Sequence, residues 1–110
     1  MSWAHWDEVD GGRRVLVVVS ARTVEVWDAS EPRALRQLLA MDCDDRLVCA
    51  RVVNKKWIGV LLPSSLVVYT LSAVSVVEQR FPFSGVGCRL ETSGRFVVVV
   101  SSRSREIFEC

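Results

Sequence analysis

The stretch VLVVVSARTVEVWD, residues 15–28, decides the fold of this chain. It consists of an apolar run, a short polar turn and a second run in which valine alternates with other residues before Trp27-Asp28. Valine fits the pleated surface of a sheet better than a helix, and two such runs joined by a turn indicate an antiparallel pair of strands. The bias is general, because the 110 residues include 21 valines.

The first half of this pattern occurs twice more along the chain. The runs WIGVLL, residues 57–62, and FVVVVS, residues 96–101, resemble VLVVVS in length and composition. Short, nearly continuous apolar runs are typical of strands that are buried on both faces. Counted from Val15, Ile58 and Phe96, the three runs are 43 and 38 residues apart.

The second half recurs as well, each time with an aromatic residue near its end. Trp27, Tyr69 and Phe108 follow one another at spacings of 42 and 39 residues. Two landmarks therefore agree on one period, and four-stranded units of about forty residues are typical of β-propeller blades. The repeat predicts inner strands at 47–53 and 86–91 and outer strands at 34–40 and 75–81. A short helix is the alternative for 34–40.

The predicted fold class is all-β, an incomplete WD-repeat-like β-propeller of about two and a half four-stranded antiparallel blades. We expect an N-terminal arm at 1–13, then a partial blade at 14–41 that lacks its first strand. A complete blade at 46–81 and a partial blade at 85–110, without its fourth strand, follow. Because closure takes at least four blades, we expect the chain to be a piece of a larger fold or a truncated product of one.

Two short motifs carry a resemblance to WD repeats. Val24-Glu-Val-Trp-Asp, which ends in Trp27-Asp28, resembles the end of such a repeat, and Ser93-Gly-Arg-Phe-Val resembles the turn into its second strand. From Val24 to about Ser102, the order and spacing of segments are similar to the second and third blades of the PROPPINs. These are seven-bladed, phosphoinositide-binding WD-repeat propellers of autophagy, and they include the WIPI proteins.

The likeness to PROPPINs extends to RLVCARVVNKKWIGVLL, residues 46–62, which resembles the family's strand, basic turn and strand, and to FPFSGVGC, residues 81–88, which resembles its link into the third blade. The family binds phosphoinositides with a Phe/Leu-Arg-Arg-Gly motif. Here Gly11-Gly12-Arg13-Arg14 holds paired arginines in a different frame, so the lipid site is not carried over. The resemblance implies the side of a propeller whose loops bind other autophagy proteins.

The function we expect is that of a non-enzymatic protein-interaction scaffold, PROPPIN-like, in autophagy or membrane trafficking. Partners would be other proteins that bind the blade loops, and peripheral association with phosphoinositide membranes is expected only within a longer chain. The expected location is cytoplasmic, including the surface of autophagic or endosomal membranes. A generic WD-repeat scaffold in another assembly is the first alternative.

The second alternative is a small single-span membrane protein. Residues 57–77 carry no charge and are long enough to cross a bilayer as a helix. Pro63-Ser64-Ser65 near the middle favours instead a turn between two strands. With 14 basic and 13 acidic side chains the chain has no strong basic field, so we expect no nucleic-acid partner.

Candidate contacts for a partner or an acidic surface are Arg33, Arg36, Lys55 and Lys56, which fall at predicted turns or strand ends. We expect neither a cofactor nor enzymatic activity, because the only histidine, His5, lies in the predicted arm.

We also expect no metal site. The cysteines lack paired spacing, and the acidic run at 42–45 lacks the pattern of a calcium loop. Trp3 and Trp6 fit either a docking arm or packing against the first sheet, and the sequence does not choose between them.

Overall fold

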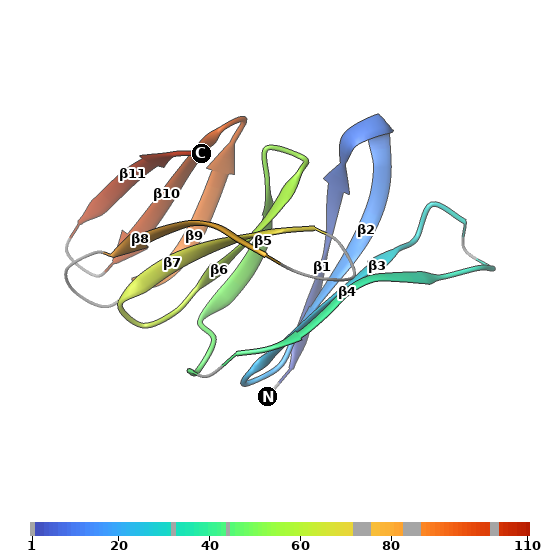
Figure 1. The fold of residues 1–110 in the computed structure, drawn as a ribbon, viewed down its shortest axis with the longest axis horizontal. Helices are drawn as coiled ribbons and strands as arrows, with labels where there is room; N and C mark the ends of the chain where they lie inside the picture. The colour runs from blue at the N-terminus through green and yellow to red at the C-terminus, as the bar shows by residue number, and fades with distance from the viewer. Residues whose placement is uncertain (1, 32, 44, 72–75, 83–86, 102–103) are drawn as a thin grey trace.

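The computed structural model describes residues 2–31, 33–43, 45–71, 76–82, 87–101 and 104–110. Within these residues the strands form three antiparallel sheets of four, four and three strands (Figure 1). The first sheet has the order β1 (Trp3–Val9), β2 (Arg13–Val19), β3 (Thr23–Asp28) and β4 (Arg36–Asp42). The second has β5 (Cys49–Val53), β6 (Trp57–Leu61), β7 (Ser65–Thr70) and β8 (Val77–Pro82). The third has β9 (Gly87–Ser93), β10 (Phe96–Ser101) and β11 (Arg105–Glu109).

Each sheet is an up-and-down meander in chain order, which is the arrangement of a propeller blade. The predicted all-β class, with an incomplete set of blade-like sheets, is confirmed. The predicted outer strand at 34–40 is also present as β4, and the helical alternative for this segment is wrong. Its helical propensity is overridden because β4 pairs along its length with β3.

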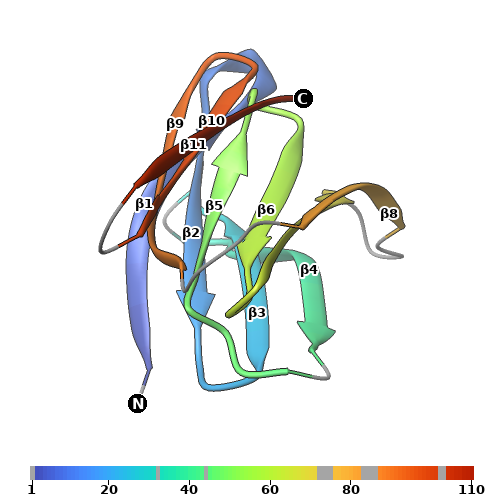
Figure 2. The same ribbon diagram turned by 90° about the vertical axis from the view of Figure 1, so that its left-hand side faces the viewer.

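The three sheets stack on one another with the second in the middle (Figure 1, Figure 2). We call the side of a sheet that is turned toward the next sheet in chain order its forward face, and the opposite side its backward face. The forward face of the first sheet packs on the backward face of the second, and the forward face of the second packs on the backward face of the third. Within the described residues, therefore, only the second sheet is covered on both faces.

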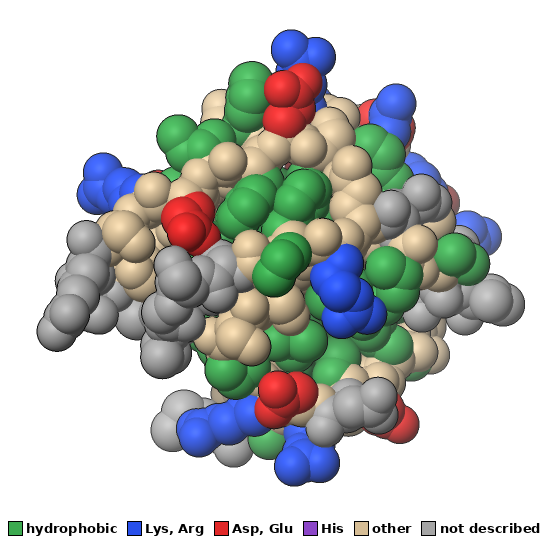
Figure 3. All heavy atoms as spheres, turned by 60° about the vertical axis from the view of Figure 1, so that its left-hand side comes forward, with side chains coloured by type: hydrophobic (Ala, Val, Ile, Leu, Met, Phe, Trp, Pro, Cys, Tyr) green, Lys and Arg blue, Asp and Glu red, His purple; other side chains and the backbone are tan. Residues whose placement is uncertain are grey.

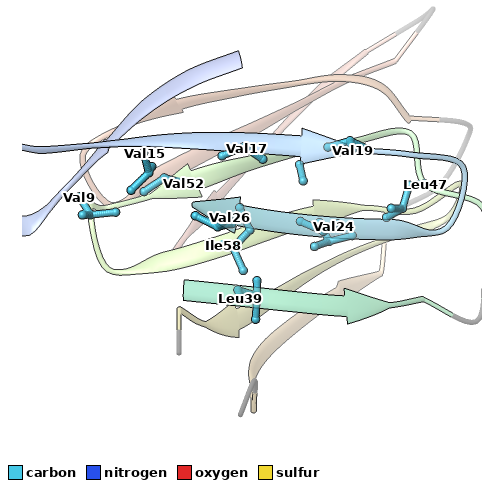
Figure 4. Packing of buried hydrophobic residues seen from close by; sticks show 12 residues of the cluster. Val9, Val15, Val17, Val19, Val24, Val26, Leu39, Leu47, Val52 and Ile58 are labelled. Atoms are coloured by element: carbon cyan, nitrogen blue, oxygen red, sulfur yellow. The ribbon is translucent and has the colours of Figure 1, made fainter. Parts of the chain in front are cut away.

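The first interface is a layer of small β-branched side chains (Figure 4). The first sheet contributes Val15, Val17, Val19, Val24, Val26 and Leu39. The second sheet contributes Ala50, Val52, Ile58 and Val60. All of these side chains are at most 4% exposed, so the two sheets meet without a gap that water could fill.

The second interface joins the second and third sheets. Its buried side chains are Val53, Leu61, Leu66, Val68, Leu90, Val97 and Val99. At the rim of this layer the rings of Phe81 on β8 and Phe108 on β11 stack at a centroid distance of 4.7 Å. Aromatic contacts of this kind add to the free energy of burial.

The prediction that the three apolar runs are buried on both faces holds for one of them. In β6 every residue from Ile58 to Leu61 is buried. In β2 and β10 buried side chains alternate with half-exposed ones, because each of these sheets is covered on one face only. The prediction was wrong for these two strands because the sequence does not show which faces another sheet covers.

The N-terminal arm predicted at 1–13 is wrong. Residues 3–9 form β1, which pairs with all seven residues of β2, and the first sheet therefore has its inner strand. The turn Asp10–Gly12 follows, with φ values of 83° at Gly11 and 70° at Gly12 that glycine adopts easily. The strand was missed because, within β1, only Val9 is buried, so the usual alternation of apolar residues is missing.

The hydrogen-bond register refines the repeat. Val15, Trp57 and Phe96 occupy equivalent positions, because they pair with Asp28, Thr70 and Glu109, each of which directly follows the aromatic residue of its strand. Their spacings of 42 and 39 residues equal those of the aromatic residues. Trp57, and not Ile58, is thus the equivalent of Val15.

The membrane-spanning helix considered for 57–77 is not formed. Residues 57–61 and 65–70 are the antiparallel strands β6 and β7, and the N–H of Leu62 donates to the carbonyl of Ser65 across the expected turn. Residues 72–75 lie outside the described part of the chain. Within that part, no helix has the length and apolarity needed to cross a bilayer.

Replacing Gly59 tests how tightly the second sheet is enclosed. A Cβ at this position would lie 2.9 Å from Cγ2 of Val53 and 3.6 Å from methyl carbons of Leu66 and Leu90. We expect Gly59→Val to lower the free energy of unfolding by about 1–3 kcal/mol, because overpacking forces neighbouring side chains to shift. Ala40→Val, at an exposed position of β4, is the control and should change stability by less than about 0.5 kcal/mol in chemical denaturation. Equal stability of the two variants would contradict the tight enclosure.

Candidate functional site: the turn end and the inner strands

The topology brings the predicted contact residues to one end of the stack. The turns β1–β2, β5–β6 and β9–β10 and the loop β3–β4 all lie at the same ends of their strands, because the strands alternate in direction. The turns β1–β2 and β5–β6 are joined by a hydrogen bond from the N–H of Asp10 to the carbonyl of Lys55, 3.0 Å long. We call this end of the molecule the turn end (Figure 1).

Lys55 and Lys56 lie in the tight turn between β5 and β6. Asn54 and Lys55 have φ values of 51° and 58°, a left-handed conformation, and the N–H of Lys56 donates to the carbonyl of Val53 at 3.2 Å to close the turn. Both lysines are exposed, and Nζ of Lys55 lies 3.4 Å from a carboxylate oxygen of Glu8 on β1. The charge of Lys55 is thus partly balanced within the molecule.

Arg33 and Arg36 lie in and just after the loop between β3 and β4, and both are exposed. Arg36 lies opposite Asp28 in the register of β4 and β3. It lines a hollow of about 370 Å³ together with Arg13 and Glu31. Arg13 also lies 3.3 Å from Asp28. The described contacts do not join this pair of arginines to Lys55 and Lys56, so the four residues share an end of the molecule without forming one cluster.

The aromatic residues of the repeat, and Asp28 after the first of them, have structural roles. Tyr69 and Phe108 lie on backward faces and pack against the preceding sheet, whereas Trp27 lies on the outer face of the first sheet. Asp28 accepts a hydrogen bond of 2.9 Å from the N–H of Ser30. That bond, with the nearby charges of Arg13 and Arg36, holds the pKa of Asp28 below its ordinary value. The carboxylate thereby fixes the start of the β3–β4 loop.

A feature that the sequence did not reveal is a hollow of about 320 Å³ along the inner strands β1, β5 and β9. It is lined by Trp3, His5, Trp6, Cys49, Arg51, Arg89 and Leu90. The rings of Trp3 and His5 stack at 5.2 Å, so both side chains lie on the forward face of β1. The guanidinium carbon of Arg14 lies over the ring of Trp6, 4.7 Å from the ring centroid. Both tryptophans therefore belong to the first sheet and not to a docking arm.

Side-chain bonds to backbone groups connect the three inner strands. Asp7 on β1 accepts a hydrogen bond of 2.9 Å from the N–H of Val52 on β5. Arg51 on β5 reaches the carbonyl of Leu90 on β9 at 3.5 Å, which is long for a hydrogen bond. Because β5 is the edge strand of its sheet, the carboxylate of Asp7 satisfies a backbone donor that would otherwise remain unpaired.

Burial by itself would raise the pKa of Asp7, but other contacts outweigh it. The His5 ring nitrogen, 3.5 Å away, and the N–H groups of Val52 and Glu8 hold the pKa below 3.8. Asp7 is therefore ionised at neutral pH, and it links the first two sheets as a charged acceptor.

The hollow presents hydrogen-bond donors, and its described contacts join the inner strands. Nε of Arg51 is buried without a hydrogen-bond partner among the described residues, and Nε2 of His5 has the contact of 3.5 Å with Asp7. Burial raises the pKa of the Cys49 thiol to about 11, so this thiol is protonated at neutral pH and is a poor nucleophile. In the described ranges, no three His, Cys, Asp or Glu side chains are grouped so that they could hold a metal ion.

Sequence reasoning missed Asp7 and Arg51 because both lie on inner strands whose pairing it did not resolve. A signal exists in hindsight, since His5, Arg51 and Glu91 are equivalent in register, opposite Val17, Gly59 and Val98. A polar residue thus occurs at the same position of each inner strand.

Comparison with known proteins adds no relative: no protein-family model matches the chain, and no curated protein matches it.

Asp7→Asn tests the carboxylate bridge between the first two sheets. At pH 7 we expect the variant to lose about 1 kcal/mol of unfolding free energy, because an amide oxygen is a weaker acceptor than a carboxylate. The folded pKa is depressed, so the contribution is present above the ordinary value of 3.8 and is lost as the pH falls through the folded pKa. Urea denaturation from pH 7 to pH 2 should show the two proteins converging below pH 3.8. Asp10→Asn, on the exposed turn, is the control, and a constant difference between wild type and Asp7→Asn at all pH values would contradict the bridge.

Proposed function

We propose that the chain is a non-enzymatic WD-repeat propeller segment that acts as a protein-interaction scaffold, PROPPIN-like, in autophagy or membrane trafficking. The observation that carries the proposal is the shared register of Trp27, Tyr69 and Phe108 in three stacked, blade-like sheets. Propellers present their inter-strand loops as binding surfaces, and loops on a rigid scaffold are where binding residues concentrate.

The turn end is the proposed protein-binding surface. It carries Arg33, Arg36, Lys55 and Lys56, all of them exposed. It also carries acidic partners, since Lys55 lies beside Glu8, Arg13 beside Asp28, and Arg95 within 3.1 Å of Glu109. A surface of mixed and partly paired charges favours specific protein contacts over adsorption to an anionic membrane.

Weak lipid binding follows from the same charges. Each lysine or arginine near an anionic bilayer contributes about 1 kcal/mol, and pairing with an acid reduces this contribution. The Phe/Leu-Arg-Arg-Gly motif of PROPPINs does not occur in these 110 residues. Any phosphoinositide site would therefore belong to other blades of a longer chain. Binding at that site would place the protein at autophagic or endosomal membranes.

A pair of charge-reversal variants tests the scaffold. Lys55→Glu/Lys56→Glu changes the turn end, and Arg22→Glu/Arg46→Glu makes the same change in charge in exposed loops at the opposite end. Affinity purification from cells with quantitative mass spectrometry should recover trafficking or autophagy proteins with the wild type. Their recovery should fall at least five-fold with the first variant and less than two-fold with the second. Recovery of no protein above background, or equal losses with both variants, would contradict the proposal.

Flotation with vesicles separates protein binding from lipid binding. With phosphatidylcholine vesicles, with or without 5% phosphatidylinositol 3-phosphate, about the same small fraction of the chain should float, because its basic side chains are few and partly paired. Flotation that requires the phosphoinositide would show that the chain holds a lipid site of its own. Lys55→Glu/Lys56→Glu would then tell whether that site is at the turn end.

A further inference from the structure

The forward face of the third sheet is apolar along its central strand. Phe96, Val98 and Val100 from β10 lie on it, together with Ile107 from β11. The flanking strands place charged residues on the same face, Arg89 and Glu91 from β9, which form an ion pair, and Arg105 and Glu109 from β11. Phe96 is 42% exposed and Ile107 is 68% exposed. Figure 3, which brings this side of the molecule forward, shows hydrophobic side chains near the middle with a basic side chain beside them, and most other charged side chains further out.

The internal repeat shows that this face corresponds to faces that are buried elsewhere in the same chain. Ile107 pairs with Val98, as Val26 pairs with Val17 in the first sheet and Val68 with Gly59 in the second. Val26 and Val68 are fully buried because a following sheet covers them. Ile107 is at the same position, but within the described residues no sheet covers it.

The opposite end of the stack shows the matching pattern. The backward face of the first sheet carries Ala4, Trp6, Leu16 and Val18. In register these are equivalent to Ala50, Val52, Ile58 and Val60 of the second sheet, which are 0–4% exposed. Trp6, by contrast, is 56% exposed. Repeat proteins usually end in units with a polar outer face, whereas both end faces of this stack keep apolar residues between their charged ones.

We propose that the first sheet of a second copy of this chain docks on the forward face of the third sheet. Forward-on-backward packing already occurs twice within the chain, between its first and second and between its second and third sheets. The two uncovered faces are the same two kinds of surface, so joining them continues the stack with a third interface of the same type. Such a contact is head-to-tail, since each copy contributes a different face.

Charges at the margins of the two faces also match. We place the turn end of the docked copy beside the turn end of the first, as the turn ends of neighbouring sheets are placed within the chain. Glu109, at the turn end of β11, then lies at the same end as Arg14 of the docked copy. Arg105, at the other end of β11, lies near the level of Glu25. Each pair brings opposite charges together, which favours this orientation over the reversed one. The proposal concerns the end faces of these 110 residues, which further blades would cover in a longer chain, and it is independent of partner binding at the turn end.

Two single variants test the head-to-tail contact in the full chain. Ile107→Glu places a charge on the forward face of the third sheet, and Trp6→Glu places one on the backward face of the first. Sedimentation velocity of the wild type should give a mass that rises with concentration above the chain mass of 12.3 kDa. Each variant alone should stay at the chain mass. An equimolar mixture should form a dimer of twice that mass, because each variant retains the face that the other has lost.

Leu35→Glu is the matched control, because Leu35 is 55% exposed but lies in the β3–β4 loop away from both faces; it should associate as the wild type does. Circular dichroism checks that each variant is folded, and Phe96→Glu and Ala4→Glu replace any variant that is not. A wild type that stays monomeric up to 200 µM would overturn the proposal. So would an Ile107→Glu variant that still associates, or two monomeric variants that fail to dimerise when mixed.

Discussion

The burial of the second sheet on both faces is the interaction on which the rest of the structure depends. From Ile58 to Leu61, β6 has no side chain exposed to solvent, so it requires a layer on each side. Burial of apolar surface contributes roughly 25 cal/mol per Å², and removal of either neighbouring sheet would return one face of β6 to water. Gly59 shows how crowded this face is, since its missing side chain leaves room for Val53 and Leu66 of the same sheet and for Leu90 of the third sheet. The bridge from Asp7 to Val52 then ties the inner edges of the first two sheets where apolar packing ends.

The molecule has two kinds of surface, and their physical character differs. The turn end is polar, and several of its charges are paired, as in the contacts of Lys55 with Glu8 and of Arg13 with Asp28. The end faces have exposed apolar residues at positions that are buried in the other sheets, with charged residues on either side of them. The first kind favours selective contacts with other proteins, whereas the second favours another sheet of the same construction.

Most strands could be predicted from the sequence because the repeat brings two landmarks into agreement. The second and third strands of all three sheets follow from the apolar runs and from Trp27, Tyr69 and Phe108. β1 was not predictable in the same way, because His5 and Asp7 occupy positions where a buried strand would have apolar residues. The candidate site was likewise predicted only in part. Arg33, Arg36, Lys55 and Lys56 were found at turns as expected, but the hollow with Arg51 and His5 depends on which inner strands lie side by side.

The sequence by itself determined most of the strands and their period, because valine content and aromatic spacing are local properties of the chain. It also determined that the basic pairs fall at turns. Only the tertiary structure decided which faces are covered, since burial depends on the neighbour that a strand acquires and not on its own residues. Val17 and Val98 occupy equivalent positions, yet the first is fully buried and the second half-exposed. The difference arises because a sheet follows the first of them in the stack, and within the described residues none follows the second.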